Sequence, residues 1–270
     1  MTESLKKRIK TAIIIGIPIL ALLFFSDTSR SIFLILLIGL TAIEYLLLYY
    51  KPLKSGLPQV VISLLATTCI TYLAFTQILP LFALLAASLL VGSLYLIDLL
   101  FAPIKYLRIL PWLNSILYTT LPLSTLLYLR DTPYFQHLVI GSILLIWVSD
   151  IGAYFVGKSI GKHKLMPTIS PGKTKEGFLG AGMCTLLVSY ILFSTIGEFS
   201  FRSWALIGLS VWLFGSTGDL VESKIKRSLN IKDSSNILPG HGGFLDRFDG
   251  FYFCLPFVIL VVYLTHNSVI

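Results

Sequence analysis

Charged side chains are scarce in this sequence. Only 13% of its 270 residues are Asp, Glu, Lys or Arg, whereas 56% are hydrophobic, and the mean hydropathy is +0.86. A water-soluble domain carries about twice that proportion of charged residues. Because the apolar residues also come in continuous runs rather than in amphipathic periods, the composition excludes a soluble globular domain and indicates a polytopic membrane protein.

Other features are missing as well, and each absence excludes a class of protein. The cysteines Cys69, Cys184 and Cys254 stand isolated in apolar runs, so there is neither a disulfide framework nor a Cys-x-x-Cys metal pair. The net charge of +8 comes without a basic patch interleaved with exposed aromatic residues, and we therefore expect no nucleic-acid binding. No small-residue cleavage site follows the basic segment Lys6–Lys10, so we expect a retained first helix rather than a signal peptide.

Apolar runs of the length needed to cross the hydrocarbon core, about 20 residues, occur nine times. Strand-like alternation is absent, so we expect nine helices and an all-α polytopic membrane fold. The expected spans are Ile9–Phe25, Ser31–Tyr50, Leu57–Phe75, Leu79–Phe101, Trp112–Leu129, Gln136–Val156, Phe178–Gly197, Ser203–Glu222 and Phe248–Thr265. Pro103, Pro111 and Pro122 favour breaks in or beside the fourth and fifth spans. We expect one continuous membrane domain, with scaffold helices in residues 1–135 and the chemistry in residues 136–270.

The distribution of Lys and Arg predicts the orientation of these helices. With nine spans and a cytoplasmic N-terminus, 18 of the 21 basic residues fall on the cytoplasmic side, and only Arg30, Arg130 and Arg202 fall outside. The polar stretch Ser223–Gly250 then faces the cytoplasm. The compact length is typical of a protein of the bacterial plasma (inner) membrane.

The first half of the chain holds little chemistry. Its deep acidic residues are Glu44 and Asp98, each of which costs about 2.5–3.5 kcal/mol near the bilayer centre. We interpret both as partners in helix–helix hydrogen bonds, or as residues near the headgroups, rather than as parts of a site.

The stretch Ser223–Gly250 lies between two apolar runs and is too polar to remain there unless it meets water or a ligand. Asp246 and Asp249 are three residues apart and share one face of a helix, and Asp219 and Glu222 repeat that spacing. Such oxygen ligands suit Mg2+, which usually takes one or two carboxylates together with substrate phosphate oxygens. The alternative is a salt-bridge network at the membrane edge between these acids and the neighbouring bases. Acidic and basic side chains converge around one turn, Pro239–Gly243, and this convergence favours a site for an anion and a metal ion.

That turn is rich in glycine. Gly240, Gly242 and Gly243 let backbone N–H groups approach phosphate oxygens, particularly where a helix begins just after them. His241 lies in the same turn, where it either contacts a phosphate, carries a proton or forms a hydrogen bond that shapes the turn.

A second basic segment, Gly157–Gly177, contains five lysines together with Ser170 and Thr174. Its Gly-Lys-Thr triplet around Lys173 resembles the end of a Walker A loop, but Pro167 stands where that motif needs glycine, and no strand precedes it. We therefore reject a P-loop. A loop that binds polyphosphate or lipid phosphate and a merely basic loop beside lipid headgroups both fit this composition.

The two stretches together resemble the phosphatidate cytidylyltransferases, also called CDP-diacylglycerol synthases. The main signature is filled by Ser223, Lys226, Arg227, Lys232, Asp233, Ser235, Leu238, Pro239, His241, Gly242, Gly243, Phe244, Asp246, Arg247 and Asp249. The upstream part is similar at Asp150, Ala153, Tyr154, Gly157, Gly161, Lys162, Ile169, Ser170, Pro171, Lys173, Thr174, Glu176 and Gly177. The resemblance covers about residues 149–250, and the first half of the chain adds only its hydropathy.

This resemblance implies transfer of a cytidylyl group from CTP to phosphatidic acid with Mg2+, and a second metal ion is an option. Under it, the metal ligands are Asp219, Asp246 and Asp249, and the catalytic group also includes Lys226, Arg227, Arg247 and His241. The nucleotide or lipid phosphate contacts Ser170, Lys173, Thr174, Lys226, Arg227, Gly242, Gly243 and Arg247. The partners are CTP, phosphatidic acid and membrane lipid, and a homodimer is left open. A CTP-dependent lipid kinase and a transporter with a carboxylate coupling site are the alternatives.

Overall fold

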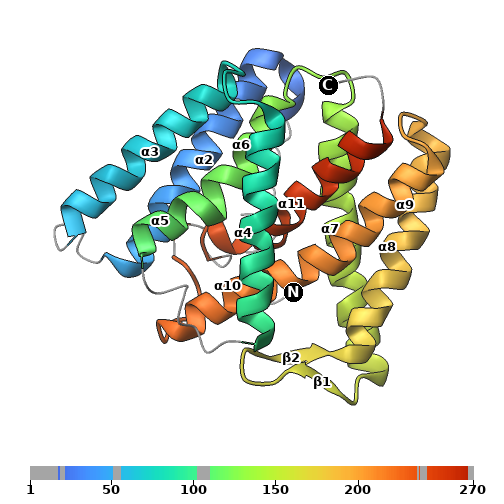
Figure 1. Cartoon of the computed structure of the whole chain (residues 1–270). Helices are drawn as coiled ribbons and strands as arrows, with labels where there is room; N and C mark the ends of the chain where they lie inside the picture. Colours follow the sequence, from blue (N-terminus) through green and yellow to red (C-terminus); the bar gives the residue numbers. More distant parts are fainter. Residues whose placement is uncertain are drawn as a thin grey trace. The chain divides into compact units, whose positions relative to one another are not determined.

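The computed structural model describes residues 18, 22–50, 56–101, 110–235, 237 and 242–266. This part of the chain is predominantly helical (Figure 1). Its helices are α2 (Asp27–Tyr49), α3 (Leu57–Phe75), α4 (Leu81–Phe101), α5 (Pro111–Ser115), α6 (Leu121–Tyr128), α7 (Phe135–Ile160), α8 (Lys175–Ile196), α9 (Phe201–Ser210), α10 (Ser216–Ser228) and α11 (Leu245–Thr265). The π-helical segments η2 (Ile116–Thr120) and η3 (Val211–Gly215) join α5 to α6 and α9 to α10.

Seven of the described helices are long and apolar enough to cross a membrane. They are Asp27–Tyr49, Leu57–Phe75, Leu81–Phe101, Phe135–Ile160, Lys175–Ile196, Phe201–Ser228 and Leu245–Thr265, and each overlaps one of the predicted spans. Of the other two predictions, Ile9–Phe25 lies mostly outside the described residues, and Trp112–Leu129 is an interrupted helix that is not among the seven. The all-α polytopic membrane fold is confirmed, whereas the count of nine and the position of the N-terminus stay predictions.

The interrupted helix shows what its prolines do. Pro111 occupies the start of α5, where its missing N–H and fixed φ are tolerated. Pro122 has no N–H to donate to the carbonyl of Tyr118, and the chain passes through the π-helical segment η2 just before it. There the N–H of Leu121 donates to the carbonyl of Ile116 instead. The prolines thus disturb the helix without ending it.

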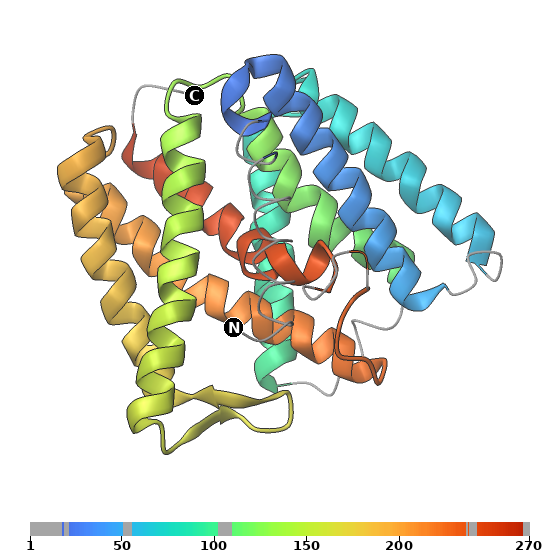
Figure 2. The same ribbon diagram turned by 180° about the vertical axis from the view of Figure 1, so that it is seen from behind.

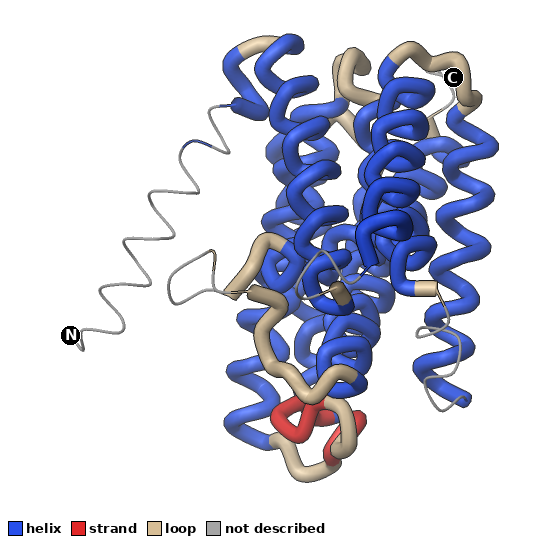
Figure 3. The backbone as a smooth tube through the Cα atoms, turned by 90° about the vertical axis from the view of Figure 1, so that its left-hand side faces the viewer, coloured by secondary structure: helices blue, strands red, loops and turns tan. Residues whose placement is uncertain are grey.

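The strands of the described structure form a single hairpin, which the sequence had not predicted. β1 (Lys164–Met166) and β2 (Ser170–Thr174) pair antiparallel, with Lys164 opposite Thr174 and Met166 opposite Ser170. The hairpin connects the end of α7 to the start of α8 (Figures 2 and 3). The predicted basic loop is therefore an ordered element that presents its lysines in a defined register.

One carboxylate, that of Glu176 in the first turn of α8, closes the base of this hairpin. It accepts hydrogen bonds from the backbone N–H groups of Lys162 at 3.1 Å and His163 at 3.2 Å, and it lies 2.6 Å from Nδ1 of His163. The backbone N–H of Lys175 also donates to the carbonyl of His163 at 2.8 Å. These contacts hold both ends of the hairpin at one point.

Two compact units make up the chain, and each draws on two separate stretches. The first unit comprises Met1–Asp131 and Ile225–Phe248, and the second comprises Thr132–Lys224 and Asp249–Ile270. Within the first, α2 packs against α3, α5 and α6. Within the second, α7 packs along α8 (Figure 1). The polar stretch after α10 is therefore grouped with the N-terminal helices, and the predicted division into scaffold residues 1–135 and catalytic residues 136–270 stays a prediction.

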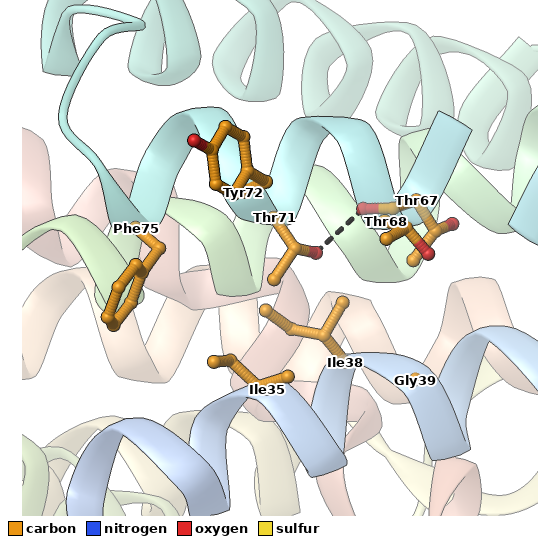
Figure 4. A pocket seen from close by; sticks show the side chains of 8 residues that line it. All are labelled: Ile35, Ile38, Gly39, Thr67, Thr68, Thr71, Tyr72 and Phe75. Carbon is orange, nitrogen blue, oxygen red and sulfur yellow. Dashed lines mark hydrogen bonds between the residues drawn. The ribbon is translucent and has the colours of Figure 1, made fainter. Parts of the chain in front are cut away.

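A pocket of about 260 Å³ opens between α2 and α3 in the first unit (Figure 4). It is lined by Ile35, Ile38, Gly39, Thr67, Thr68, Thr71, Tyr72 and Phe75. No acidic or basic side chain lines this pocket, so it offers no charge to bind a phosphate or a metal ion.

Candidate functional site

Most of the site residues that the sequence predicted lie on three elements, and Gly242 and Gly243 lie in the loop before α11. Ser170, Lys173 and Thr174 lie on β2 of the hairpin. Asp219, Lys226 and Arg227 lie on α10, and Asp246, Arg247 and Asp249 lie in the first turns of α11. His241 lies outside the described residues. Both α10 and α11 pass from one unit to the other, so the residues are described below unit by unit.

Within the first unit, Lys226 and Asp246 form a buried ion pair. Nζ of Lys226 lies 2.6 Å from Oδ1 of Asp246, and the two side chains are only 11% and 5% exposed. Oδ2 of Asp246 accepts hydrogen bonds from the backbone N–H groups of Ser234 at 2.8 Å and Gly243 at 2.9 Å, and from the Ser234 hydroxyl at 2.9 Å. A buried carboxylate is stable only when its oxygens are paired in this way. Asp246 therefore organises the polar stretch around itself.

The two glycines after His241 make room for carboxylates. Gly242 has φ +78°, in the left-handed region that favours glycine, and a Cβ there would collide with the Asp246 carboxylate. A Cβ at Gly243 would overlap the Glu44 carboxylate and the Ser234 hydroxyl. The predicted approach of this backbone to a ligand is untested, but its approach to Asp246 and Glu44 already requires glycine.

Glu44 of α2 is part of this arrangement, and sequence reasoning missed it. Its side chain is buried, accepts a hydrogen bond from the Ser234 hydroxyl, and accepts others from the Ser235 hydroxyl at 3.0 Å and from the backbone N–H of Leu245 at 3.1 Å. Glu44 thus bonds to the signature loop and to the first residue of α11, rather than only to a neighbouring scaffold helix. The sequence feature that could have revealed this role is the presence of an acidic residue within an apolar helix.

The cations Arg227 and Arg247 are exposed. The Arg227 guanidinium donates to the carbonyl of Ile231 at 2.9 Å, which holds it beside the loop that follows α10. Exposed guanidinium groups near a polar loop can reach the phosphates of a ligand, with paired N–H groups suited to two oxygens at once.

Within the second unit, Lys173 and Asp219 form a more open ion pair. Nζ of Lys173 lies 2.6 Å from Oδ2 of Asp219 and 3.1 Å from the carbonyl of Ser216, and the two side chains are 28% and 40% exposed. The Ser223 hydroxyl donates to Oδ1 of Asp219 at 3.3 Å. The hairpin therefore brings Lys173 onto Asp219 of α10, a contact that the sequence did not specify.

Thr174 has a structural use for its hydroxyl. It is the N-cap of α8, where its Oγ1 accepts from the backbone N–H of Gly177 at 3.1 Å, and the residue is buried. This places Thr174 at the end of the hairpin but leaves its predicted contact with a phosphate untested. Ser170 lies at the start of β2 and is half-buried.

Asp249 lies where α10 and α11 approach each other within the second unit. A Cβ at Gly218 would lie 2.9 Å from the Asp249 carbonyl, and one at Gly250 would lie 3.0 Å from the Gly215 carbonyl. Oδ1 of Asp249 accepts from the backbone N–H of Gly250 at 2.6 Å. The small residues thus bring the backbones together next to Asp249 and one residue before Asp219.

The predicted metal ligands differ in how well they suit a divalent ion. Within the described ranges, no group of three or more His, Cys, Asp or Glu side chains could hold a metal ion. Asp219 nevertheless fits Mg2+, because its carboxylate is 40% exposed and this ion commonly takes one or two protein carboxylates beside phosphate oxygens. Asp246 fits less well as arranged, since Lys226, Ser234 and Gly243 occupy its oxygens.

The match to a protein family spans nearly the whole chain, whereas the similar relatives match a little under half of it. The profile described as the cytidylyltransferase family matches residues 6–265. Phosphatidate cytidylyltransferase of Staphylococcus aureus (strain COL) is 48% identical over 128 residues, which make up 47% of this chain and 49% of that protein. The protein of the same name from Bacillus subtilis (strain 168) is 50% identical over 121 residues, or 44% and 45% of the two chains. The matched segment thus spans about half the length of these relatives.

Proposed function

Because this chain belongs to the cytidylyltransferase family, we propose that it transfers the cytidylyl group of CTP to phosphatidic acid. The products are CDP-diacylglycerol and pyrophosphate. The two relatives support this pair of substrates, since each is named phosphatidate cytidylyltransferase. The observation that carries the proposal is the partly exposed Lys173–Asp219 pair, in which the lysine suits a phosphate oxygen and the carboxylate suits a metal ion.

The chemistry needs no strong general base. A phosphate oxygen of phosphatidic acid is already anionic near neutral pH and attacks the α-phosphorus of CTP, while the bond from that phosphorus to the bridging oxygen of the β-phosphate breaks. Pyrophosphate leaves with the electron pair of that bond. Catalysis then depends on aligning the two phosphates and on neutralising their charges.

Three cations supply that neutralisation, of which Arg227 and Arg247 are exposed and Lys173 is partly buried. Arg227 and Arg247 bind triphosphate oxygens through paired N–H groups, and Lys173 binds one through its ammonium. When a phosphate displaces Asp219 from Lys173, the freed carboxylate oxygen becomes available to a cation. The pair would thus open as the substrate arrives.

Asp219 and Asp249 would hold a magnesium ion, and Asp246 would do so only by releasing Lys226. When bound, Mg2+ would neutralise negative charge on the phosphates and draw electrons from the bond that breaks. Asp219 is the principal ligand in this proposal, because its carboxylate is 40% exposed whereas that of Asp246 is 5% exposed.

The setting of the reaction follows from the substrates. One substrate is a membrane lipid and the other is a soluble nucleotide, so we place the site at the cytoplasmic face of a bacterial plasma membrane. Ser170 and Thr174 on the hairpin, with Gly242 and Gly243 of the loop, would contribute to phosphate binding there, and His241 would contact a phosphate. A homodimer is compatible with this proposal.

Labelled CTP provides the test. The purified protein would be incubated with CTP labelled at the α-phosphate, with and without phosphatidic acid and Mg2+. We expect the label in CDP-diacylglycerol only when both are present. Label found entirely in free CDP would instead indicate a lipid kinase, and lipid or ion flux in proteoliposomes without CTP would indicate a transporter.

A further inference from the structure

Glu44 lies on α2, in the part of the chain that the sequence interprets as scaffold, yet its carboxylate contacts the loop that carries the family signature. We propose that Glu44 is a positioning residue for the reaction, which holds Ser234, Ser235 and the start of α11 so that Asp246 keeps its geometry. The proposal rests on the cytidylyl-transfer function. It assigns a role to a residue far from the signature in sequence.

The first contact fixes the beginning of a helix. The first N–H groups of a helix have no partner within it, and Leu245 is the first residue of α11. Oε2 of Glu44 accepts the N–H of Leu245 at 3.1 Å, and a negative charge is favourable at a helix N-terminus. Glu44 therefore caps α11 from another helix, one residue before Asp246.

The second contact runs through one hydroxyl group. Oγ of Ser234 contacts Oε1 of Glu44 and also lies 2.9 Å from Oδ2 of Asp246. A serine hydroxyl has a single hydrogen, so it donates to one of these carboxylates at a time. Ser234 thus links the two acids directly, and a change at Glu44 alters which hydrogen bonds reach Asp246.

The third contact is steric. Gly243 lies so close to the Glu44 carboxylate that a Cβ there would overlap it, while the N–H of Gly243 donates to Asp246 at 2.9 Å. The backbone at Gly243 therefore contacts both the Glu44 and the Asp246 carboxylate. Truncating the Glu44 side chain removes its contact with the Gly243 backbone.

The test compares three variants in the full-length protein. Glu44→Ala deletes all three contacts, whereas Glu44→Gln keeps the size of the side chain and retains one acceptor oxygen. Thr41→Val is the matched control, because Thr41 is equally buried on α2 but bonds only to the carbonyls of Leu37 and Ile38 of its own helix. Hydrogen–deuterium exchange of the segment 231–247 and steady-state kinetics with CTP and phosphatidic acid are measured for each.

We expect Glu44→Ala to speed exchange in residues 231–247 and to lower kcat roughly 10- to 100-fold, since misplacing a catalytic segment by about 1 Å has effects of this size. Glu44→Gln should recover part of both the protection and kcat, and Thr41→Val should match the wild type in both. If Glu44→Ala does not fold, Ser234→Ala replaces it, with the same acceleration of exchange and loss of kcat expected.

The outcomes separate this inference from the proposed function. A wild-type protein that makes CDP-diacylglycerol, with Glu44→Ala (or Ser234→Ala in its place) no different from Thr41→Val in kcat and exchange, would overturn the role of Glu44 alone. A wild-type protein without cytidylyl transfer would overturn the function, while the exchange data would still report whether Glu44 holds the loop. Equal exchange in all variants would show that Glu44 does not anchor it.

Discussion

The ammonium of Lys226 and the carboxylate of Asp246 pair at 2.6 Å in a nearly buried position. Substituting Lys226 by Met would leave the Asp246 carboxylate buried without its cation, and breaking such a pair destabilises a protein by about 3–5 kcal/mol. We expect the Lys226→Met variant to unfold at a markedly lower temperature in detergent.

The double variant Lys226→Met/Asp246→Asn is the control for this prediction, because it removes both charges together. It should be clearly more stable than Lys226→Met alone. A Lys226→Met variant as stable as the wild type would mean that this ion pair contributes little to stability. A ligand could then displace Asp246 from Lys226 at little cost.

Substitution of Asp219 is expected to affect activity rather than stability. Its carboxylate is 40% exposed, so Asp219→Asn should leave the unfolding temperature almost unchanged while removing turnover, because the variant no longer supplies the proposed metal ligand. Asp131→Asn is a matched control, since Asp131 is a half-exposed aspartate paired with Arg130 at 2.9 Å. The CTP assay with a Mg2+ titration measures the effect, and normal turnover in Asp219→Asn would remove this carboxylate from the metal role.

Hydropathy and proline positions were sufficient to predict much of the fold. The bounds of α3, Leu57–Phe75, are those predicted, because a membrane helix is defined by the length of its apolar run. The hairpin at Lys164–Thr174 was not predictable in the same way. Its strands are short and polar, and its register depends on contacts such as that of Glu176 with His163, which lie 13 positions apart in sequence.

The residue types of the site were predictable, but their pairings were not. The sequence favoured a metal and an anion over pairing with the neighbouring bases as the partners of these acids, whereas the structure pairs Asp246 with Lys226 and Asp219 with Lys173. Glu44 was interpreted as a scaffold residue because its partner Ser234 lies 190 positions away. Local spacing carries no information about contacts over such a distance.

The glycines of the loop should be intolerant of substitution. Gly242 has φ +78°, a conformation that an L-residue adopts at a cost of roughly 1–2 kcal/mol, and a Cβ would also press on Asp246. We therefore expect Gly242→Ala to lower both the unfolding temperature and activity. Gly39→Ala is the control, because nothing lies within 4 Å of a Cβ at that helical position. Equal stability of the two variants would contradict this account of the loop.

Lys173 and Lys175 allow the two interpretations of the basic segment to be separated. Both lysines lie at the junction of β2 and α8, but Lys173 pairs with Asp219, whereas Lys175 is exposed. If the segment only attracts anionic headgroups, Lys173→Met and Lys175→Met should weaken activity equally, since each removes one positive charge from the same surface. If Lys173 binds a substrate phosphate, its loss removes a hydrogen bond between charged groups, typically worth about 1.5–3 kcal/mol, and kcat/KM should fall roughly tenfold or more in that variant alone. Measuring kcat/KM for CTP and for phosphatidic acid in vesicles would also show which phosphate Lys173 contacts, because a larger rise in one KM identifies that substrate.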